Sequence, residues 1–209
     1  MKIFLTAQSL TIRQGYTPLL EGVNFTLTQG EALHLVGVNG SGKTTLLKTL
    51  AGLLKPQKGM IHLNNDSFSS NKFHWLGTDL CLKPDLTLKE NLILWNWIER
   101  APSSRVTESL TIVEMNHYQD IPIRHLSSGQ QRRGALARLL LKDKPVWLLD
   151  EPDAYLDHRG KKLLTRLIES HRDNGGLVIF ASHYGLPLKT VHTLMLSDFF
   201  PIEKRNSWS

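Results

Sequence analysis

The stretch ALHLVGVNGSGKTTLLKTL, residues 32–50, decides the fold class of this chain. Residues 32–37 are a mostly apolar run stopped by glycine, which is typical of a buried strand. A helix is predicted from Lys43 to just before Lys55-Pro56, because the residue that precedes a proline avoids the helical conformation. Between strand and helix, GVNGSGKT (37–44) fits the pattern G-x-x-x-x-G-K-[ST]. The combination predicts a phosphate-binding loop.

The residue types of this loop suit a nucleoside triphosphate. Glycines let the loop turn its backbone N–H groups inward around the phosphates, and the helix N-terminus adds the positive end of its dipole. Lys43 is predicted to reach the β- and γ-phosphates, and the Thr44 hydroxyl is predicted to ligate Mg²⁺. The predicted nucleotide-binding set is Gly37, Val38, Asn39, Gly40, Ser41, Gly42, Lys43, Thr44 and Thr45.

A second short apolar run, VWLLDE at 146–151, ends in two carboxylates. Asp150 is placed to hold Mg²⁺ directly or through water. Glu151 is suited to polarise the attacking water as a general base. His183, one residue past LVIFAS (177–182), is predicted to hold the γ-phosphate and position that water. The alternative interpretation is structural, but the phosphate loop favours the catalytic one.

Length and composition are those of an ordinary globular protein. The chain has 209 residues, of which 41% are hydrophobic and 21% charged, so it is long enough to bury a core. We see no run near the roughly 18 apolar residues that a bilayer span needs, and the N-terminal apolar run is too short for a signal peptide. These observations predict a protein that stays in the cytoplasm.

The charge and the cysteine content argue against two features, nucleic-acid binding and internal disulfides. The formal net charge is +6, but the basic residues are spread along the chain and not interleaved with aromatics, so no nucleic acid is expected. The single cysteine, Cys81, excludes internal disulfides and is predicted to be a small, partly buried side chain.

Strand and helix patterns alternate along the chain. Apolar or alternating runs predict strands at residues 23–28, 32–37, 59–63, 73–77, 146–150, 177–182 and 192–200. Helical patterns occur at residues 43–54, 87–100, 103–116, 127–141 and 158–173. Thr87 and Glu90 have the spacing of a capping box. The alternation predicts a mostly parallel sheet in an α/β core, with the helices between about 87 and 140 inserted on one side.

Two tryptophans, Trp95 and Trp97, lie in the apolar part of the helix predicted at 87–100. They belong either to the core of the helical insertion or to a face where a membrane protein docks, and an exposed apolar patch would favour docking.

The chain resembles the ATP-binding cassette (ABC) ATPases over essentially its whole length. The motifs that carry the resemblance occur in the family's order: GVNGSGKTT (37–45), LSSGQQRR (126–133), LLDEP (148–152), AYLD (154–157) and SH (182–183). The resemblance implies one domain over 1–209, a P-loop NTPase ABC nucleotide-binding domain. Its parts would be a RecA-like α/β core, an N-terminal antiparallel β part and a helical signature subdomain at about 87–140. It also implies ATP and Mg²⁺ as ligands.

The same resemblance implies a head-to-tail homodimer. Each ATP would lie between the phosphate loop of one copy and the signature corner of the other. That corner is Ser127, Ser128, Gly129 and Gln130, of which Ser127 and Gly129 would donate to the γ-phosphate in trans. Asp157 would lie at the dimer seam.

Two positions depart from the family's pattern. Asp79 stands where these ATPases have a glutamine that touches Mg²⁺ and relays ATP binding to the membrane partner, so Asp79 is a candidate metal ligand. The aromatic that stacks on adenine falls near Gln14, and Tyr16 is the candidate base contact.

The segment LSSGQQRRGALARLLL, then VWLLDEP, a helix with His171 and GGLVIFASH together resemble the ATP-binding subunits of the cytochrome c maturation haem exporter. This implies a peripheral protein on the cytoplasmic face of the inner membrane, with integral permease subunits. ATP would drive haem delivery or release at the periplasmic haem chaperone. The coupling surface is expected around Asp79 to Leu86, in the groove between core and insertion.

Two alternatives stay open. The first is the ATPase of another ABC exporter, for a lipid, a peptide or a drug. The second is a non-transport ABC scaffold, such as one in iron–sulfur assembly. Co-purification with membrane proteins, as opposed to soluble assembly factors, separates the scaffold from the transporters.

Overall fold

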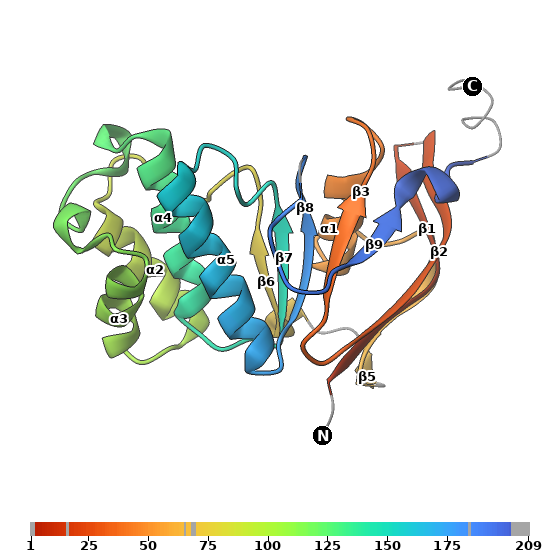
Figure 1. Cartoon of the computed structure of the whole chain (residues 1–209), viewed down its shortest axis with the longest axis horizontal. Helices are drawn as coiled ribbons and strands as arrows, with labels where there is room; N and C mark the ends of the chain where they lie inside the picture. The colour runs from red at the N-terminus through yellow and green to blue at the C-terminus, as the bar shows by residue number, and fades with distance from the viewer. Residues whose placement is uncertain (1–2, 16, 65, 68–69, 184, 202–209) are drawn as a thin grey trace. The chain divides into compact units, whose positions relative to one another are not determined.

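The structure is a computed structural model, and it describes residues 3–15, 17–64, 66–67, 70–183 and 185–201. Tyr16, the candidate adenine contact, lies outside the described residues. Contacts divide the chain into two compact units (Figure 1). The sheet unit comprises Met1–Trp75, Lys144–Glu151 and Ile168–Ser209, and the helical unit comprises Leu76–Asp143 and Pro152–Leu167.

An antiparallel sheet forms the first part of the sheet unit. Its strands, in spatial order, are β2 (Thr17–Thr28), β1 (Phe4–Gln14), β4 (Lys58–Leu63) and β5 (Asp66–Ser67). The strand predicted at 23–28 is longer than expected, because β2 pairs with β1 along nearly its whole length, from Thr28 opposite Phe4 to Thr17 opposite Gln14. The hairpin of β1 and β2 therefore extends to the pair Gln14 and Thr17, beyond the strand predicted at 23–28.

A parallel sheet forms the second part, in the order β6 (Phe73–Leu76), β7 (Val146–Asp150), β8 (Leu177–Ala181), β3 (Ala32–Val36) and β9 (His192–Met195). Every residue of β7 and β8 is buried, as expected for strands covered on both faces. The edge strand predicted at 192–200 is shorter than expected, because the chain turns into a 3-10 helix at Leu196–Phe199. The carboxyl ends of β3, β7 and β8 meet at one edge because these strands run parallel.

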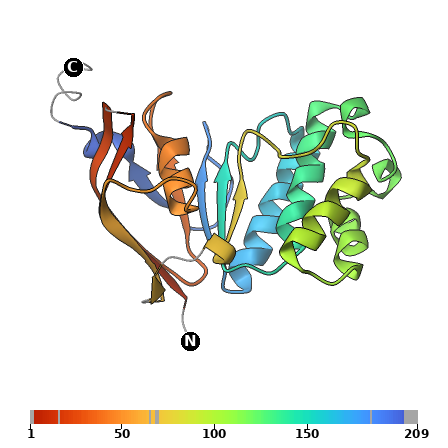
Figure 2. The ribbon, with the colours of Figure 1, turned by 180° about the vertical axis from the view of Figure 1, so that it is seen from behind.

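Helix α1 (Lys43–Leu50) follows β3 and packs against β7 and β8 (Figure 2). The helix predicted to reach residue 54 ends at Leu50, because Gly52 has a φ of 74° and the chain turns there. Leu46, Leu47 and Leu50 are buried in a hydrophobic cluster that also contains residues of both sheets. These buried leucines lie on one face of α1 and hold the helix against the sheets, just after β3.

The helical unit contains α2 (Leu88–Glu99), α3 (Ser104–Ile112), α4 (Ser128–Ala137) and the first part of α5 (His158–Asp173) (Figure 1). The predicted capping box of α2 is confirmed. The Thr87 hydroxyl accepts from the Glu90 N–H at 3.1 Å, and the Glu90 carboxylate accepts from the Thr87 N–H at 2.8 Å. The latter bond lowers the pKa of Glu90.

Several helix ends differ from the prediction. The helix predicted at 103–116 stops at Ile112, and Glu114 adopts a left-handed φ of 59° that is incompatible with a continuing helix. The helix of the LSSGQQRR segment is regular only to Ala137 and tightens into a 3-10 turn at Arg138–Leu140. Helix α5 has the predicted bounds.

The exposure of three side chains in the helical unit bears on what the sequence left to be tested. Cys81, predicted to be partly buried, is exposed, because it lies in a turn with a left-handed φ of 51°. Trp97 is 77% exposed, so the core interpretation is wrong for this residue. Trp95 is half-buried. Among the described residues, no helix has the length and apolar character needed to cross a membrane.

Candidate nucleotide-binding site

The phosphate loop joins β3 to α1 and depends on its glycines. Gly40 and Gly42 have φ values of 76° and 105°, a region that glycine enters at low cost. A Cβ at Gly37 would lie 2.5 Å from the Ser41 Oγ, which is shorter than any normal contact. The first and last glycines of the motif are therefore required by the fold of the loop itself.

Two polar side chains of the loop have the chemistry of a phosphate site. The Lys43 ammonium donates to the carbonyls of Gly37 at 2.7 Å and Val38 at 3.2 Å. Ser41 is 1% exposed. Its hydroxyl oxygen has no hydrogen-bond partner within the described part of the chain. A buried hydroxyl without a partner costs free energy, and a phosphate oxygen would supply one. This loop fits a phosphate ligand.

Thr44 and Asp150 meet at the start of α1. The Thr44 hydroxyl donates to the Asp150 Oδ2 at 2.7 Å, and Asp150 is buried at the end of β7. Hydroxyl and carboxylate oxygens are ligands that Mg²⁺ accepts. The structure thus brings together the two residues that the sequence assigned to the metal from positions 106 apart in the chain.

A cavity of about 290 Å³ joins these groups. Its lining consists of Gln14, Leu19, Asn39, Gly40, Gly42, Lys43, Thr44, Thr45, Asp150 and Glu151. Six of the nine predicted loop residues from 37 to 45 line it. Gln14, the position near which the resemblance places the adenine-stacking aromatic, lies in the same lining, so the far end of β1 reaches the cavity.

Glu151 and His183 also lie together at this edge of the sheet. Glu151 has a φ of 50°, and its N–H donates to the Ala181 carbonyl at 2.9 Å. The left-handed backbone of a residue with a side chain costs about 1–3 kcal/mol and recurs at functional sites. The His183 Nε2 lies 3.8 Å from the Glu151 Oε1. The predicted base and the predicted γ-phosphate contact are thus close neighbours.

Sequence reasoning missed His34, which lies on β3 next to this pair. Its Nε2 donates to the Ser182 carbonyl at 3.0 Å, and its ring stacks on Phe180 at 4.7 Å. A polar residue in the apolar strand ALHLV was the signal that would have drawn attention to it.

The signature corner opens α4 in the helical unit. The Ser127 Oγ accepts from the Gln130 N–H at 3.2 Å, and the Gln130 Oε1 accepts from the Ser127 N–H at 2.8 Å. This second capping box leaves the Ser127 hydroxyl proton available as a donor. A Cβ at Gly129 would lie 2.9 Å from the Tyr155 carbonyl, so this position requires glycine. The corner is a rigid helix N-terminus with donors at its first turn.

Asp157 and Asp79 both accept hydrogen bonds from nearby backbone. The Asp157 Oδ1 accepts from the Gly160 N–H at 2.7 Å, in the first turn of α5. The Asp79 Oδ1 accepts from the Cys81 N–H at 2.8 Å, so that its carboxylate braces its own turn. The dimer-seam and metal assignments of these two residues stay predictions.

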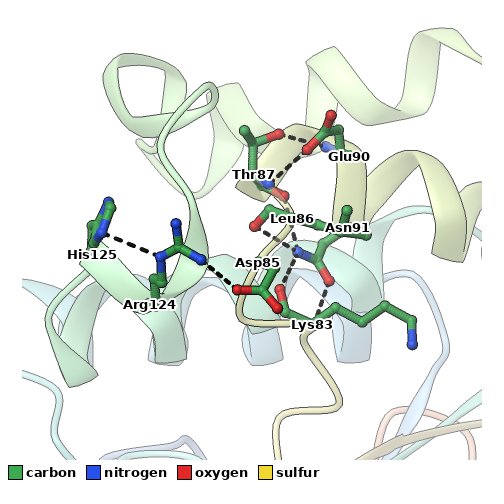
Figure 3. A network of polar contacts seen from close by, with 8 residues as sticks. All are labelled: Lys83, Asp85, Leu86, Thr87, Glu90, Asn91, Arg124 and His125. Carbon is green, nitrogen blue, oxygen red and sulfur yellow. Dashed lines mark hydrogen bonds and ion pairs between the residues drawn. The ribbon is translucent and has the colours of Figure 1, made fainter.

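Segment 77–91 of the helical unit is held by side chains from α2 and from the chain around α4. The buried Asn91 accepts from the Lys83 N–H at 2.7 Å and donates to the carbonyls of Lys83, Leu86 and Thr87 (Figure 3). Arg124 forms an ion pair with Asp85 in the same view (Figure 3). These contacts fix the shape of the loop that precedes α2.

Two arginines of α4 and the turn after it hold the first part of the segment. Arg132 donates to the Gly77 carbonyl at 2.9 Å, and Arg138 donates to the Leu80 carbonyl. The Arg138 guanidinium also lies 3.8 Å from the centre of the Trp95 ring, whose Nε1 donates to the Cys81 carbonyl at 3.1 Å. Burial lowers the pKa of Arg138, although an arginine stays charged at neutral pH.

A second cavity, of about 420 Å³, lies within the helical unit next to this segment. Its lining consists of Thr78, Asp79, Leu80, Leu82, Pro84, Ile123, Arg124, Ser128, Gln131, Arg132 and Tyr155. The cavity therefore joins part of the expected coupling segment, Asp79 to Leu86, to the first turns of α4.

A family model described as "ABC transporter" matches residues 20–154. The chain belongs to this family, and the predictions of its fold and of an ABC-type ATPase are confirmed. It is similar to an ABC transporter ATP-binding protein from Pyrococcus furiosus, with a TM-score of 0.84 and 26% identity over 95% of this chain and 100% of that one. It is also similar to cbiO1 from Clostridium perfringens, with a TM-score of 0.72 and 28% identity over 86% and 78% of the two chains.

Relatives of known name point to one group within the ABC transporter family. The chain is 39% identical over 208 residues to the "Cytochrome c biogenesis ATP-binding export protein CcmA" of Agrobacterium fabrum, covering 95% of this chain and 98% of that protein. It is 38% identical over 189 residues to the protein of the same name from Rhodopseudomonas palustris strain HaA2, covering 89% and 94%. The resemblance inferred from the motifs is confirmed.

Proposed function

We propose that this chain is the ATP-hydrolysing subunit of a haem exporter complex in cytochrome c biogenesis. The observation that carries the proposal is the 39% identity, over 95% of the chain, to a cytochrome c biogenesis ATP-binding export protein. In this proposal the chain is a peripheral protein at the cytoplasmic face of the inner membrane. It drives integral permease subunits, and the outcome is haem delivery or release at the periplasmic haem chaperone.

ATP binds at residues 37–45 in this proposal. The inward N–H groups and the Lys43 ammonium hold the β- and γ-phosphates, and the buried Ser41 hydroxyl gains its missing acceptor. Thr44 and Asp150, already joined at 2.7 Å, would hold Mg²⁺, which neutralises phosphate charge when bound. The groups are supplied by β3, α1 and β7, so rigid elements position them.

Glu151 accepts a proton from the attacking water, and His183 donates a hydrogen bond to the γ-phosphate. The 3.8 Å separation of their side chains keeps both within reach of one water molecule beside the phosphate. Because little covalent chemistry falls to the protein in phosphoryl transfer, positioning and charge stabilisation supply most of the acceleration.

A second copy of the chain completes the site. The signature corner, Ser127 to Gln130, presents the Ser127 hydroxyl and the first N–H groups of α4 to an anion. In a head-to-tail dimer these donors meet the γ-phosphate bound by the other copy, and Asp157 lies at the seam. ATP favours the closed dimer because it binds both halves, and hydrolysis releases them.

The permease docks at the 420 Å³ cavity of the helical unit in this proposal. Apolar residues of the coupling segment, Leu80 and Leu82, form part of its lining beside Asp79 and Arg124. Leu82→Asp would place an unpaired charge there, and should abolish stimulation of the ATPase by the permease. Stimulation at the wild-type level in this variant would remove the cavity from the coupling path.

The test is made in cells that carry Glu151→Gln in place of the wild type, with holo-cytochrome c and the haem-loaded chaperone as the readouts. Loss of the general base slows hydrolysis by about 10²–10⁴-fold, so holo-cytochrome c should disappear while other secreted proteins stay normal. Glu21→Gln, at an exposed position of β2, is the matched control. Normal cytochromes in the Glu151→Gln cells would contradict the haem assignment and favour another exporter.

A further inference from the structure

His34 stands beside the catalytic edge of the parallel sheet without belonging to the predicted site. It occupies the middle of β3 and pairs with Phe180 on β8. The two rings stack at 4.7 Å with an interplanar angle of 6°. The His34 Nε2 reaches past the end of β8 to the Ser182 carbonyl at 3.0 Å. Because a carbonyl only accepts, the Nε2 carries a proton in this contact.

The segment that leads to His183 is therefore held from both neighbouring strands. On the β7 side, the Ala181 carbonyl accepts from the Glu151 N–H at 2.9 Å. On the β3 side, the next carbonyl, that of Ser182, accepts from His34. Ser182 is 4% exposed and His34 is half-buried, so this hydrogen bond is partly shielded from solvent. Two consecutive carbonyls thus fix the peptide from which His183 extends.

Gly185, two residues after His183, also lies next to the His34 ring. A Cβ built at Gly185 would lie 3.6 Å from the His34 Cε1, an ordinary contact distance, so Gly185 lies against the ring. His34 therefore neighbours both Ser182 and Gly185, whereas the His183 side chain is 59% exposed.

We propose that His34 is a positioning residue for ATP hydrolysis, which acts by holding the Ser182 carbonyl so that His183 meets the γ-phosphate and Glu151. This inference rests on the function proposed above, in which His183 contacts the γ-phosphate. His34 touches neither nucleotide nor water in this account, so its loss changes the rate of the chemical step and leaves ATP affinity unchanged.

The test uses the full chain in the complex with which it purifies from membranes. In His34→Phe the ring and its stacking on Phe180 remain, but the donor is lost. His34→Gln keeps a side-chain N–H donor of similar reach. His34→Phe should lower kcat about tenfold, because small displacements of a catalytic group cost up to about 10²-fold, with the KM for ATP unchanged. His34→Gln should recover most of the rate.

A double-mutant cycle separates positioning from a general loss of structure. If His34 acts through His183, then His34→Phe has no further effect on kcat in a His183→Ala background. The same fractional loss in both backgrounds would overturn the proposal, as would a wild-type kcat in His34→Phe or failure of His34→Gln to recover activity. If His34→Phe does not fold, His34→Leu replaces it as the variant without a donor.

The cycle also distinguishes failure of the inference from failure of the proposed function. His183→Ala at the wild-type rate would remove the catalytic assignment of His183 and the inference with it. A slow His183→Ala beside an unaffected His34→Phe would overturn only the role of His34.

Discussion

The phosphate loop at 37–44 and segment 77–91 of the helical unit satisfy their polar groups in opposite ways. In the phosphate loop the charged Lys43 folds onto the carbonyls of Gly37 and Val38, and the buried Ser41 oxygen has no partner among the described residues. In segment 77–91, arginine, tryptophan and asparagine side chains hold one carbonyl after another. The polar groups of the phosphate loop can exchange their present hydrogen bonds for bonds to a ligand. The hydrogen bonds of segment 77–91 instead hold that segment in one shape.

Mutations in the two regions should therefore affect different properties, activity in the phosphate loop and stability in segment 77–91. Replacing Lys43 in the phosphate loop should remove function and leave the fold intact, because the hydrogen bonds of Lys43 are partly open to solvent. Replacing a side chain that donates to the carbonyls of segment 77–91 should cost stability first, because those carbonyls become unpaired when the donor is lost.

Lys43→Met gives the largest expected effect, and it falls on activity. Removing a charge aimed at the transferring phosphoryl group should lower ATP hydrolysis by about 10²–10³-fold, with little change in the temperature of unfolding. ATPase rates and thermal unfolding check the two parts. Lys48→Met, an exposed position in the last turn of the same helix, is the control. An unfolded Lys43→Met would break the comparison, because the loop would then be a structural element.

Asn91→Leu should have the opposite profile. The substitution keeps the size of the side chain but unpairs backbone groups of Lys83, Leu86 and Thr87. We expect the free energy of unfolding to fall by about 3 kcal/mol, measured by urea denaturation, with ATP affinity unchanged. Asn116→Leu, at an exposed position whose side chain hydrogen-bonds to the Thr111 hydroxyl, is the control. Weakened ATP binding with unchanged stability would contradict the structural role of Asn91.

A smaller effect is expected from pH at Glu114, which Arg133, Arg159 and Arg166 surround. The hydrogen bond from Arg159 holds the pKa of the Glu114 carboxyl below its usual 4.5. Because the folded pKa is depressed, the extra stability is present above pH 4.5 and is lost as the pH falls through the lower, folded value. Unfolding measured against pH should show this loss in the wild type but not in Glu114→Gln. Parallel curves for the two proteins would show that the ion pairs contribute nothing.

The sequence predicted the parts of the site that local patterns encode. The phosphate loop, the capping box of Thr87 and Glu90 and the bounds of α5 each depend on residues a few positions apart, and each is present in the structure. The meeting of Thr44 with Asp150 followed from one further rule, that carboxyl ends of parallel strands share an edge.

Other contacts between distant segments, which depend on packing, were beyond prediction. The reach of His34 to the Ser182 carbonyl spans 148 positions, and the approach of Gly129 to the Tyr155 carbonyl joins α4 to the turn before α5. No periodicity records such pairs, because they depend on how elements pack. Cys81 was predicted to be partly buried from its residue type, but the hydrogen bond from its N–H to Asp79 holds it in an exposed turn.

We expect the phosphate loop and the signature corner to be two halves of one ATP site, supplied by two copies of the chain. The most direct test is the molecular mass of Glu151→Gln in solution, measured by light scattering with and without Mg²⁺ and ATP. We expect a monomer that becomes a dimer when Mg²⁺ and ATP are added, and a monomer under both conditions when Ser127→Glu is combined with Glu151→Gln. A Glu151→Gln protein that binds ATP and stays monomeric would contradict the shared site.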